Sequence, residues 1–275
     1  MPSLLNPELQ SPAAAPLKAR LAACELTIGS WITLAHPSIA EIMGRVGFDW
    51  IVIDAEHSVI GVDEVQRLIQ ALDGAGCPAI VRLTSNDADQ IKRAMDAGAT
   101  GVMVPLVRSV QDVRDAVAAV YYPPRGVRGV GLARAQGYGA GFLSYLRWLD
   151  ENAVVVAMIE HVDAVERIDA ILAVDHLDAF IVGPYDLSAS MGMPGQIDHP
   201  RVQDALRAVL AAGQRARKPG GIHVVEPEPE RIGRHIAAGF RFLGYSLDIR
   251  TLDALLRRDL GGIRAAAARH AVAGS

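Results

Sequence analysis

Short apolar runs that end at polar residues recur along the chain and alternate with amphipathic stretches. Such runs are typical of parallel strands covered on both faces, and the stretches between them have the apolar spacing of helices. Gly47, Gly98 and Gly239 separate a helical stretch from the next run, where a helix C-cap needs a positive φ. The predicted strands are 27–33, 50–54, 78–82, 101–105, 154–159, 179–183, 220–224 and 241–245, and the predicted helices include 62–74, 87–96, 110–120, 164–172 and 202–217.

This alternation predicts a single-domain (β/α)8 barrel, with an open doubly wound sheet as the alternative. Gly126, Gly129 and Gly131 do not form a dinucleotide-binding motif, so no nucleotide cofactor is expected. We predict an N-terminal arm over 1–17, the barrel over 18–250, and a C-terminal helix and tail over 251–275. The amphipathic stretch 251–271 either covers its own barrel or is exchanged with a neighbouring subunit.

Composition excludes several classes of protein. The hydrophobic fraction of 51% excludes intrinsic disorder, and a formal net charge of −4 argues against a nucleic-acid partner. The chain has no signal-peptide pattern at its start and no apolar run of membrane-spanning length, so we expect a soluble cytoplasmic protein with no membrane partner. Cys24 and Cys77 are too few for a disulfide framework, and we expect structural thiols.

Polar residues follow most of the predicted strands. In a (β/α)8 barrel the catalytic groups lie at these carboxyl ends, so this set is where the chemistry is expected. It consists of Asp54, Glu56, His57, Arg82, Glu160, His161, Asp186, His223, Ser246 and Asp248.

Glu160 and Asp186 follow two neighbouring apolar strands, with no basic residue inside either run. Two converging carboxylates repel each other unless a cation or a proton lies between them, and hard oxygen ligands suit Mg²⁺ or Mn²⁺. The pair therefore indicates a divalent-metal site. The alternative is a pair of solvated acids that bind arginine.

His57 is the candidate general base because it follows a buried strand beside two acids, and Asp54 is placed to orient its imidazole. Arg82 ends the third strand, where a guanidinium clamps a carboxylate or stabilises an oxyanion. A salt bridge from Arg82 to Asp54 or Glu56 is compatible with that role. Trp31 is predicted to lie in the barrel core.

Of the 27 basic residues only Lys18, Lys92 and Lys218 are lysines, and none ends a predicted strand. This placement argues against imine chemistry through a Schiff-base lysine. No serine nucleophile elbow is present either. The remaining hypothesis is metal-assisted chemistry on a small oxyanion.

Seven segments, taken together and in order, resemble the HpcH/HpaI aldolase family, the metal-dependent class II pyruvate aldolases. The similarity covers about residues 28–255. The segments are 47–57 (GFDWIVIDAEH), 81–82 (VR), 86–98 (NDADQIKRAMDAG), 104–105 (VP), 122–129 (YPPRGVRG), 159–160 (IE) and 183–188 (GPYDLS).

The resemblance implies an aldolase that cleaves a 4-hydroxy-2-oxo acid to pyruvate and an aldehyde through a metal-stabilised pyruvate enolate. It implies that Glu160 and Asp186 hold Mg²⁺, Mn²⁺ or Co²⁺. It further implies roles for residues that contact the base or the substrate. In these roles His57 is the base with Asp54 as its partner, Arg82 stabilises the transition state, Asp96 tunes the histidine, Trp31 lines the pocket, and Gly183, Pro184, Tyr185 and Asp186 bind the substrate carboxylate.

The sequence departs from the family pattern at a few positions. Met158 stands two residues before Glu160, where the family commonly has a substrate-binding glutamine, and His161 follows where a small hydroxyl residue is usual. Asp96 ends a helical segment, at the end of the barrel opposite the active site, so it reaches a His57 only from a neighbouring subunit or where that helix is broken. The resemblance also implies a trimer of dimers, a homohexamer, with swapped C-terminal helices.

Two other functions are compatible with these residues. The first is oxaloacetate decarboxylation or another enolate-forming reaction, as in macrophomate-synthase-like relatives. The second is a non-catalytic oxo-acid-binding protein. The presence of His57, Arg82, Glu160 and Asp186 together argues against the second.

Overall fold

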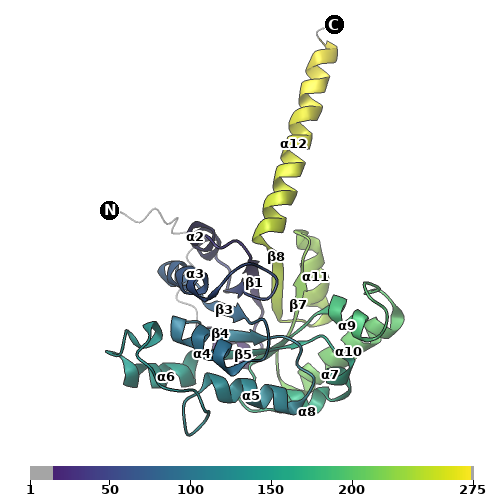
Figure 1. Cartoon of the computed structure of the whole chain (residues 1–275). Helices are drawn as coiled ribbons and strands as arrows, with labels where there is room; N and C mark the ends of the chain where they lie inside the picture. The colour runs from purple at the N-terminus through teal and green to yellow at the C-terminus, as the bar shows by residue number, and fades with distance from the viewer. Residues whose placement is uncertain (1–14, 274–275) are drawn as a thin grey trace.

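Eight parallel strands close into a barrel in the computed structural model, which describes residues 15–273 (Figure 1). Each strand pairs with the next along the chain, and the last pairs with the first. The predicted (β/α)8 barrel is confirmed, with strand ends within two residues of those predicted. The strands are β1 (Thr27–Ile32), β2 (Trp50–Asp54), β3 (Ala79–Arg82), β4 (Gly101–Val104), β5 (Val154–Ile159), β6 (Ala179–Val182), β7 (Gly220–Val224) and β8 (Phe242–Leu247).

Helices surround the barrel and connect its strands (Figure 1). The predicted helix 164–172 is divided into two short helices at Arg167, and the C-terminal helix begins three residues earlier than predicted. The helices are α1 (Leu17–Ala22), α2 (Pro37–Arg45), α3 (Val62–Gly74), α4 (Ala88–Ala97), α5 (Val110–Val120), η2 (Arg134–Gln136), α6 (Phe142–Asn152), α7 (Val162–Glu166), α8 (Ile168–Leu172), α9 (Pro184–Ser190), α10 (Pro200–Ala216), α11 (Pro229–Ala238) and α12 (Asp248–Ala273).

Three glycines end helices in the left-handed conformation, as predicted. Gly47, Gly98 and Gly239 have φ values of 100°, 103° and 108°. Residues other than glycine rarely adopt this backbone conformation, so these glycines determine where the chain turns from α2, α4 and α11 into the following strands.

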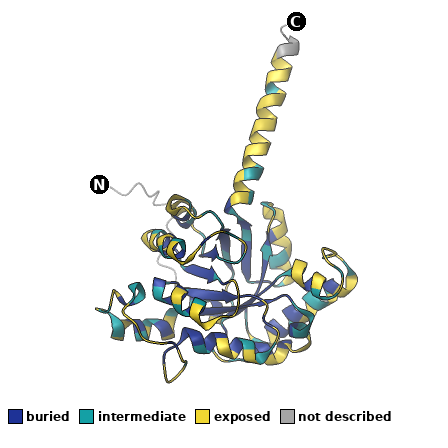
Figure 2. Cartoon of the chain, viewed as in Figure 1, coloured by how far each residue is buried: buried dark blue, intermediate teal, exposed yellow. Residues whose placement is uncertain are grey.

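The strands are mostly buried (Figure 2), and inward-facing side chains of alternate strand positions fill the barrel interior. Trp31 packs edge-to-face on Trp50 with ring centroids 5.5 Å apart, and Trp50 stacks on Phe242 at 4.1 Å. Leu17 and Leu21 of α1 belong to the same apolar cluster. α1 therefore closes the amino-terminal end of the barrel.

The predicted arm over 1–17 overlaps this closing helix. Residues 1–14 lie outside the described part of the chain, and Leu17 is already buried as the first residue of α1. For the residues before 15 the arm stays a prediction. Leu17 and Leu21 are one helical turn apart, so one helix face carries both side chains into the barrel.

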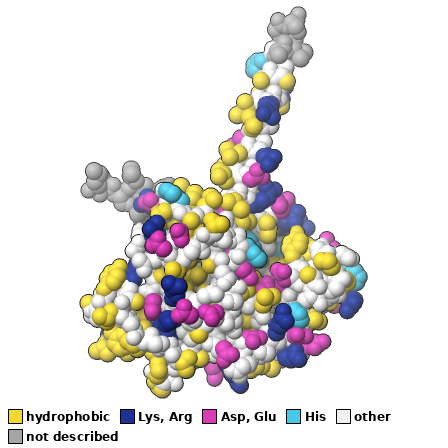
Figure 3. All heavy atoms as spheres, viewed as in Figure 1, with side chains coloured by type: hydrophobic (Ala, Val, Ile, Leu, Met, Phe, Trp, Pro, Cys, Tyr) yellow, Lys and Arg dark blue, Asp and Glu magenta, His cyan; other side chains and the backbone are white. Residues whose placement is uncertain are grey.

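α12 extends away from the barrel, and most of its length is exposed (Figures 1 and 2). Only its start is held on the barrel, where the Asp248 carboxylate accepts hydrogen bonds from the backbone N–H groups of Thr33 and Leu34. Apolar and charged side chains both line the projecting part (Figure 3). Its exposed apolar residues are Ile249, Leu252, Leu255, Leu256, Leu260 and Ile263.

None of the helices within residues 15–273 combines the length and the apolar character needed to cross a bilayer.

Candidate active site

The candidate site lies at the carboxyl ends of the strands, where the predicted polar residues meet. Asp54 and Arg82 are partners in the β2–β3 register. Glu160 follows β5 and Gly183 follows β6, directly after Ile159 and Val182, the last register pair of those two strands. Residues from at least four strands thus converge on one end of the barrel.

Arg82 forms a fork on Asp54. Its Nε lies 2.9 Å from Asp54 Oδ1, its Nη2 binds Oδ2, and its Nη1 is 3.3 Å from Glu56 Oε2. Asp54 is 2% exposed, so the pair is shielded from water. A guanidinium has five N–H groups, and the Asp54 fork uses two of them. The salt bridge predicted as compatible with an oxyanion role is present, and donors remain for a ligand.

His57 lies at the rim with its side chain 69% exposed. Its backbone N–H and that of Glu56 donate to Asp54 Oδ1 at 3.1 and 3.0 Å. The carboxylate nearest its ring belongs to Glu56, 3.8 Å from Nε2. Asp54 therefore holds the loop that carries His57 and does not bind the imidazole directly, because both of its oxygens are engaged by Arg82.

Glu160 is a buried carboxylate whose two oxygens differ. Oε1 accepts a 2.7 Å hydrogen bond from the backbone N–H of Leu106, a residue held at φ 52°. Oε2 lies over Gly183, where a β-carbon would approach it to 2.8 Å. Burial raises the pKa of Glu160 to about 7, the nearby charges of Glu56 and Asp186 raise it as well, and Leu106 and Arg82 oppose the shift.

Asp186 lies in the first turn of α9, exposed to solvent. Pro184 begins this helix, so the chain turns directly from β6 into α9. Within residues 15–273, the backbone N–H groups of Tyr185 and Asp186 have no hydrogen-bond acceptor. They are therefore available to an anionic group, next to Gly183 and the open oxygen of Glu160.

These residues fit a divalent cation. Glu160 has one oxygen open to a ligand, and burial disfavours the charged form of its carboxylate. Asp186 lies close enough to raise the pKa of Glu160. No group of three or more His, Cys, Asp or Glu side chains within the described chain has ligand spacing. Two carboxylates with the remaining positions left to water and substrate suit Mg²⁺ or Mn²⁺, which retain several such ligands.

Three further residues singled out in the sequence, Trp31, Met158 and His161, have mainly structural surroundings. Trp31 is 1% exposed and stacks on His223 with centroids 4.0 Å apart, as a core residue would. Met158 faces the barrel interior and is buried. The His161 ring accepts a hydrogen bond from the Asp163 N–H and caps α7.

Asp96 lies in the last turn of α4, away from the strand ends that carry His57. Its Oδ1 is buried without a hydrogen-bond partner among the described residues, and it is 3.9 Å from Arg128 Nε. The Arg128 guanidinium lies over the Tyr122 ring at 4.2 Å. As the helix-end position predicted, the chain does not bring Asp96 to its own His57.

All three lysines are engaged elsewhere. Lys18 lies in α1, Lys92 pairs with Asp89 on α4, and Lys218 donates to the Leu177 carbonyl oxygen before β7. None of them lies at the carboxyl end of a strand, and these positions argue against imine chemistry through a lysine.

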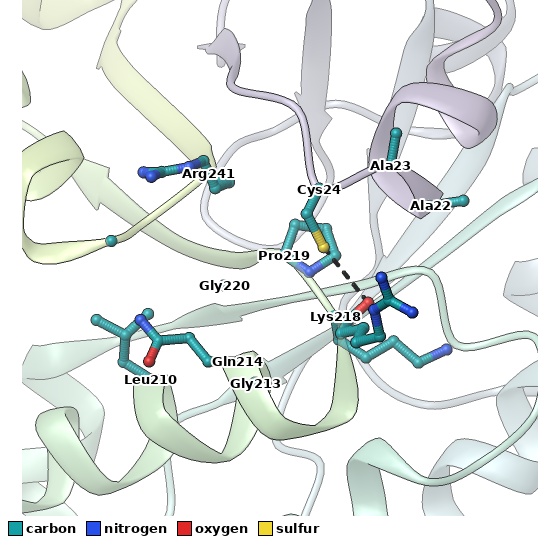
Figure 4. Close-up of a pocket in the computed structure, with 12 residues that line it drawn as sticks. Ala22, Ala23, Cys24, Leu210, Gly213, Gln214, Lys218, Pro219, Gly220 and Arg241 are labelled. Atoms are coloured by element: carbon teal, nitrogen blue, oxygen red, sulfur yellow. Dashed lines mark hydrogen bonds between the residues drawn. The ribbon is translucent and has the colours of Figure 1, made fainter.

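A cavity of about 360 Å³ lies at the other end of the barrel (Figure 4). It is bordered by the end of α1 and by the chain that leads into β7 and β8, and it includes Cys24 and Arg241. It shares no residue with the candidate site.

Two contributors to the site are not evident from the sequence. The Leu106 N–H binds Glu160, and its left-handed conformation after Pro105 leaves no sequence pattern that would reveal it. His223 is predicted only as a strand-end residue, yet its ring lies inside the barrel mouth on Trp31. The period-2 alternation of β7 could have indicated this orientation.

Known proteins resemble this chain along most of its length. The HpcH/HpaI aldolase/citrate lyase family model matches residues 27–252. A hydroxypyruvate/pyruvate aldolase of Sagittula stellata is 38% identical over 88% of this chain and 95% of its own length. A 5-keto-4-deoxy-D-glucarate aldolase of Klebsiella pneumoniae is 34% identical over 84% and 90%.

A solved structure gives the same result. An HpcH/HpaI aldolase/citrate lyase family protein from Burkholderia cenocepacia superposes with a TM-score of 0.85 at 33% identity, covering 90% of this chain and 98% of that one. Fold, strand-end residues and relatives agree along nearly the whole chain. The chain belongs to the HpcH/HpaI aldolase/citrate lyase family and is a carbon–carbon lyase.

Proposed function

We propose that the site described above cleaves a 4-hydroxy-2-oxo acid to pyruvate and an aldehyde. The observation that carries the proposal is Glu160, a buried carboxylate with one open oxygen and a raised pKa, beside the Arg82 guanidinium. A structural carboxylate at this depth would be fully paired. The named aldolases among the relatives support the same reaction.

His57 takes the proton of the substrate 4-hydroxyl group, and its exposed position at the rim gives it access to that group. The C3–C4 bond then breaks, the aldehyde leaves with a new carbonyl group, and the electron pair passes to C3. A proton at C3 completes pyruvate. Arg82 stabilises the charge that develops on the 4-oxygen, and Asp54 fixes the orientation of its guanidinium.

Glu160 and Asp186 would hold Mg²⁺, Mn²⁺ or Co²⁺. When bound, the cation supplies Lewis-acid stabilisation of negative charge on the oxo-acid oxygens. The backbone around Gly183, Pro184 and Tyr185 binds the substrate carboxylate through free N–H groups at the start of α9. Trp31 lies in the barrel interior next to this pocket, with its ring stacked on His223.

A screen for pyruvate release tests the proposal. We expect the protein to release pyruvate from a panel of 4-hydroxy-2-oxo acids in a coupled lactate dehydrogenase assay, with oxaloacetate included to detect decarboxylation. Glu160→Gln and His57→Ala should each lose activity by at least about a hundredfold, since each removes a group required by the reaction. Release from oxaloacetate alone would replace the aldolase by a decarboxylase, and no release from any compound would reject both.

Metal dependence is expected to follow pH through Glu160. EDTA should abolish pyruvate release, and Mn²⁺, Co²⁺ or Mg²⁺ should restore it. With its pKa near 7, Glu160 is protonated in acid, so binding of the cation must displace a proton. We expect the Mn²⁺ affinity measured by titration calorimetry to fall about tenfold per pH unit below pH 7 and to level off above it. Equal affinity at pH 6 and pH 8, or full activity after chelation, would contradict the metal role of Glu160.

We also propose a homohexamer, a trimer of dimers, in which neighbouring subunits complete the sites. Two observations on the described chain support contacts between copies. The exposed apolar residues of α12 form a projecting face, and an apolar surface lies over α6 and the loop before it (Figure 3). Asp96 borders this second region through Arg128, which donates to Tyr145 of α6, and its side chain is 25% exposed, so we propose that it faces a neighbour's His57 there. Sedimentation analysis of the full chain tests the assembly.

For location, we propose the cytoplasm. Cys24 and Cys77 are both free thiols, as expected in a reducing compartment. Burial raises the pKa of Cys77 to about 12, so this thiol is unreactive and structural.

A further inference from the structure

His223 points into the barrel mouth. On β7, Ile222 and Val224 pack outward in the cluster that contains Leu243, so His223 between them faces inward. Its ring stacks on Trp31 with an interplanar angle of 11°. The mechanism proposed above gives this residue no task of its own.

Glycine flanks His223 on both sides. Gly244 is its register partner on β8, and Gly183, directly after β6, lies opposite it, one residue beyond the register pair Val182 and Ile222. A β-carbon at Gly183 would collide with Glu160 Oε2. Gly183 therefore lies between the strand positions of Glu160 and His223, and it has no side chain to fill the space between them.

The protonation state of the ring is fixed by its surroundings. Nε2 lies 2.9 Å from the carbonyl oxygen of Ser246, which can only accept, so Nε2 carries the hydrogen. Ser246 has φ 51°, a left-handed turn that presents this carbonyl to the ring. Burial, assisted by Arg82, lowers the pKa of His223 to about 4, so the ring is neutral at physiological pH. Nδ1 therefore holds a lone pair and acts only as an acceptor.

Nδ1 is the ring nitrogen of His223 that Ser246 does not engage. The Cδ2 edge lies toward Gly244, and Nδ1 is on the other edge. Among the described residues Nδ1 has no hydrogen-bond partner. It is also not a fully buried atom, so a ligand or water can reach it. It is thus an open acceptor in the mouth of the barrel.

We propose that His223 determines specificity by accepting, at Nδ1, a hydrogen bond from a hydroxyl group of the substrate. The inference rests on the proposed aldolase function. The carboxylate and keto oxygens of an oxo acid are acceptors and cannot bind Nδ1, whereas a hydroxyl can. That hydroxyl belongs either to C3 of the oxo acid or to the aldehyde, and the site prefers the hydroxylated compound to its deoxy analogue.

Matched substrate pairs in the aldol direction test this proposal. Pyruvate is compared with hydroxypyruvate as the nucleophile, and acetaldehyde with glycolaldehyde as the acceptor, with Mn²⁺ present. We expect the wild-type protein to prefer one hydroxylated member by about tenfold in kcat/KM, and His223→Leu to remove most of that preference while the pyruvate–acetaldehyde rate stays within about threefold. The pair that changes identifies which hydroxyl is bound.

Two further variants keep the result decisive. His223→Gln retains an acceptor oxygen and should keep part of the preference. His223→Phe keeps an aromatic ring on Trp31 but has no acceptor, so it should behave like His223→Leu. If the leucine variant does not fold, the phenylalanine variant takes its place in the test. An unchanged preference in the Leu and Phe variants, or an equal loss of rate on all four nucleophile–acceptor combinations, overturns the proposal. Absence of all aldol turnover in the wild-type protein instead overturns the proposed function.

Discussion

Replacement of Arg82 by lysine is expected to lower kcat/KM for pyruvate release by more than about tenfold, mostly through kcat. The guanidinium binds both oxygens of Asp54 and still reaches Glu56, whereas an ammonium group is a single point of charge that cannot fork. The developing oxyanion would then meet a weaker and less well oriented donor. Steady-state kinetics on the best substrate of the panel measure the effect.

The control for this variant is a second arginine-to-lysine change at a surface ion pair. Arg215 binds Asp169 with both side chains well exposed, so Arg215→Lys should leave kcat/KM unchanged. Thermal melting of both variants separates a kinetic effect from a loss of fold. Kinetics of Arg82→Lys indistinguishable from those of the wild-type protein would reject the oxyanion role.

The barrel could be predicted because its strands are short apolar runs with polar ends. A strand covered on both faces shows this pattern without any knowledge of its neighbours, and β2, β5 and β7 begin and end where predicted. The same reasoning places Asp54 and Arg82 at adjacent strand ends. Their salt bridge follows from strand order, because consecutive parallel strands are neighbours in a barrel.

The state of the site could not be predicted in the same way. The pKa of Glu160 depends on burial and on the N–H group of the left-handed Leu106, and the space at its Oε2 depends on the missing side chain at Gly183. These features come from three different strand ends. Arg82 binds the Asp54 carboxylate, so the carboxylate beside the His57 imidazole is that of Glu56. The spacing of these residues along the chain does not show which acid lies beside the imidazole. Local sequence places residues at the mouth, but tertiary packing decides which pairs of atoms meet.

α1 shows a similar limit at the other end of the barrel. The proline- and alanine-rich start of the chain has no periodicity, so the sequence predicts a loose arm up to residue 17. Leu17 and Leu21 alone are too short a pattern to indicate a buried helix. Their burial becomes evident only when the open end of the barrel is seen, and it is accompanied by a polar contact that no motif reveals.

That contact is Lys18, whose replacement by methionine is expected to lower the free energy of unfolding by about 3–5 kcal/mol. Its Nζ lies 2.8 Å from Asp178 Oδ1 and 2.6 Å from the Ala153 carbonyl oxygen, and both side chains of the ion pair are mostly buried. Methionine preserves the apolar stem but leaves Asp178 as an uncompensated charge. Urea unfolding measures the change, and the exposed pair of Lys92 with Asp89 supplies the control, since Lys92→Met should not move the midpoint.

The loss should depend on pH in a direction that identifies its cause. Burial raises the pKa of Asp178, and Lys18 holds that pKa down. Without Lys18 the folded protein takes up a proton at Asp178 at a pH where the unfolded chain stays ionised, so its stability rises as the pH falls. The destabilisation should therefore be smaller at pH 5 than at pH 8, and Asp178→Asn in the same chain should recover part of it, because the asparagine side chain keeps an acceptor for the Val155 N–H. A loss that is equal at both pH values and unaffected by the second change would assign it to packing of α1 and not to the buried charge.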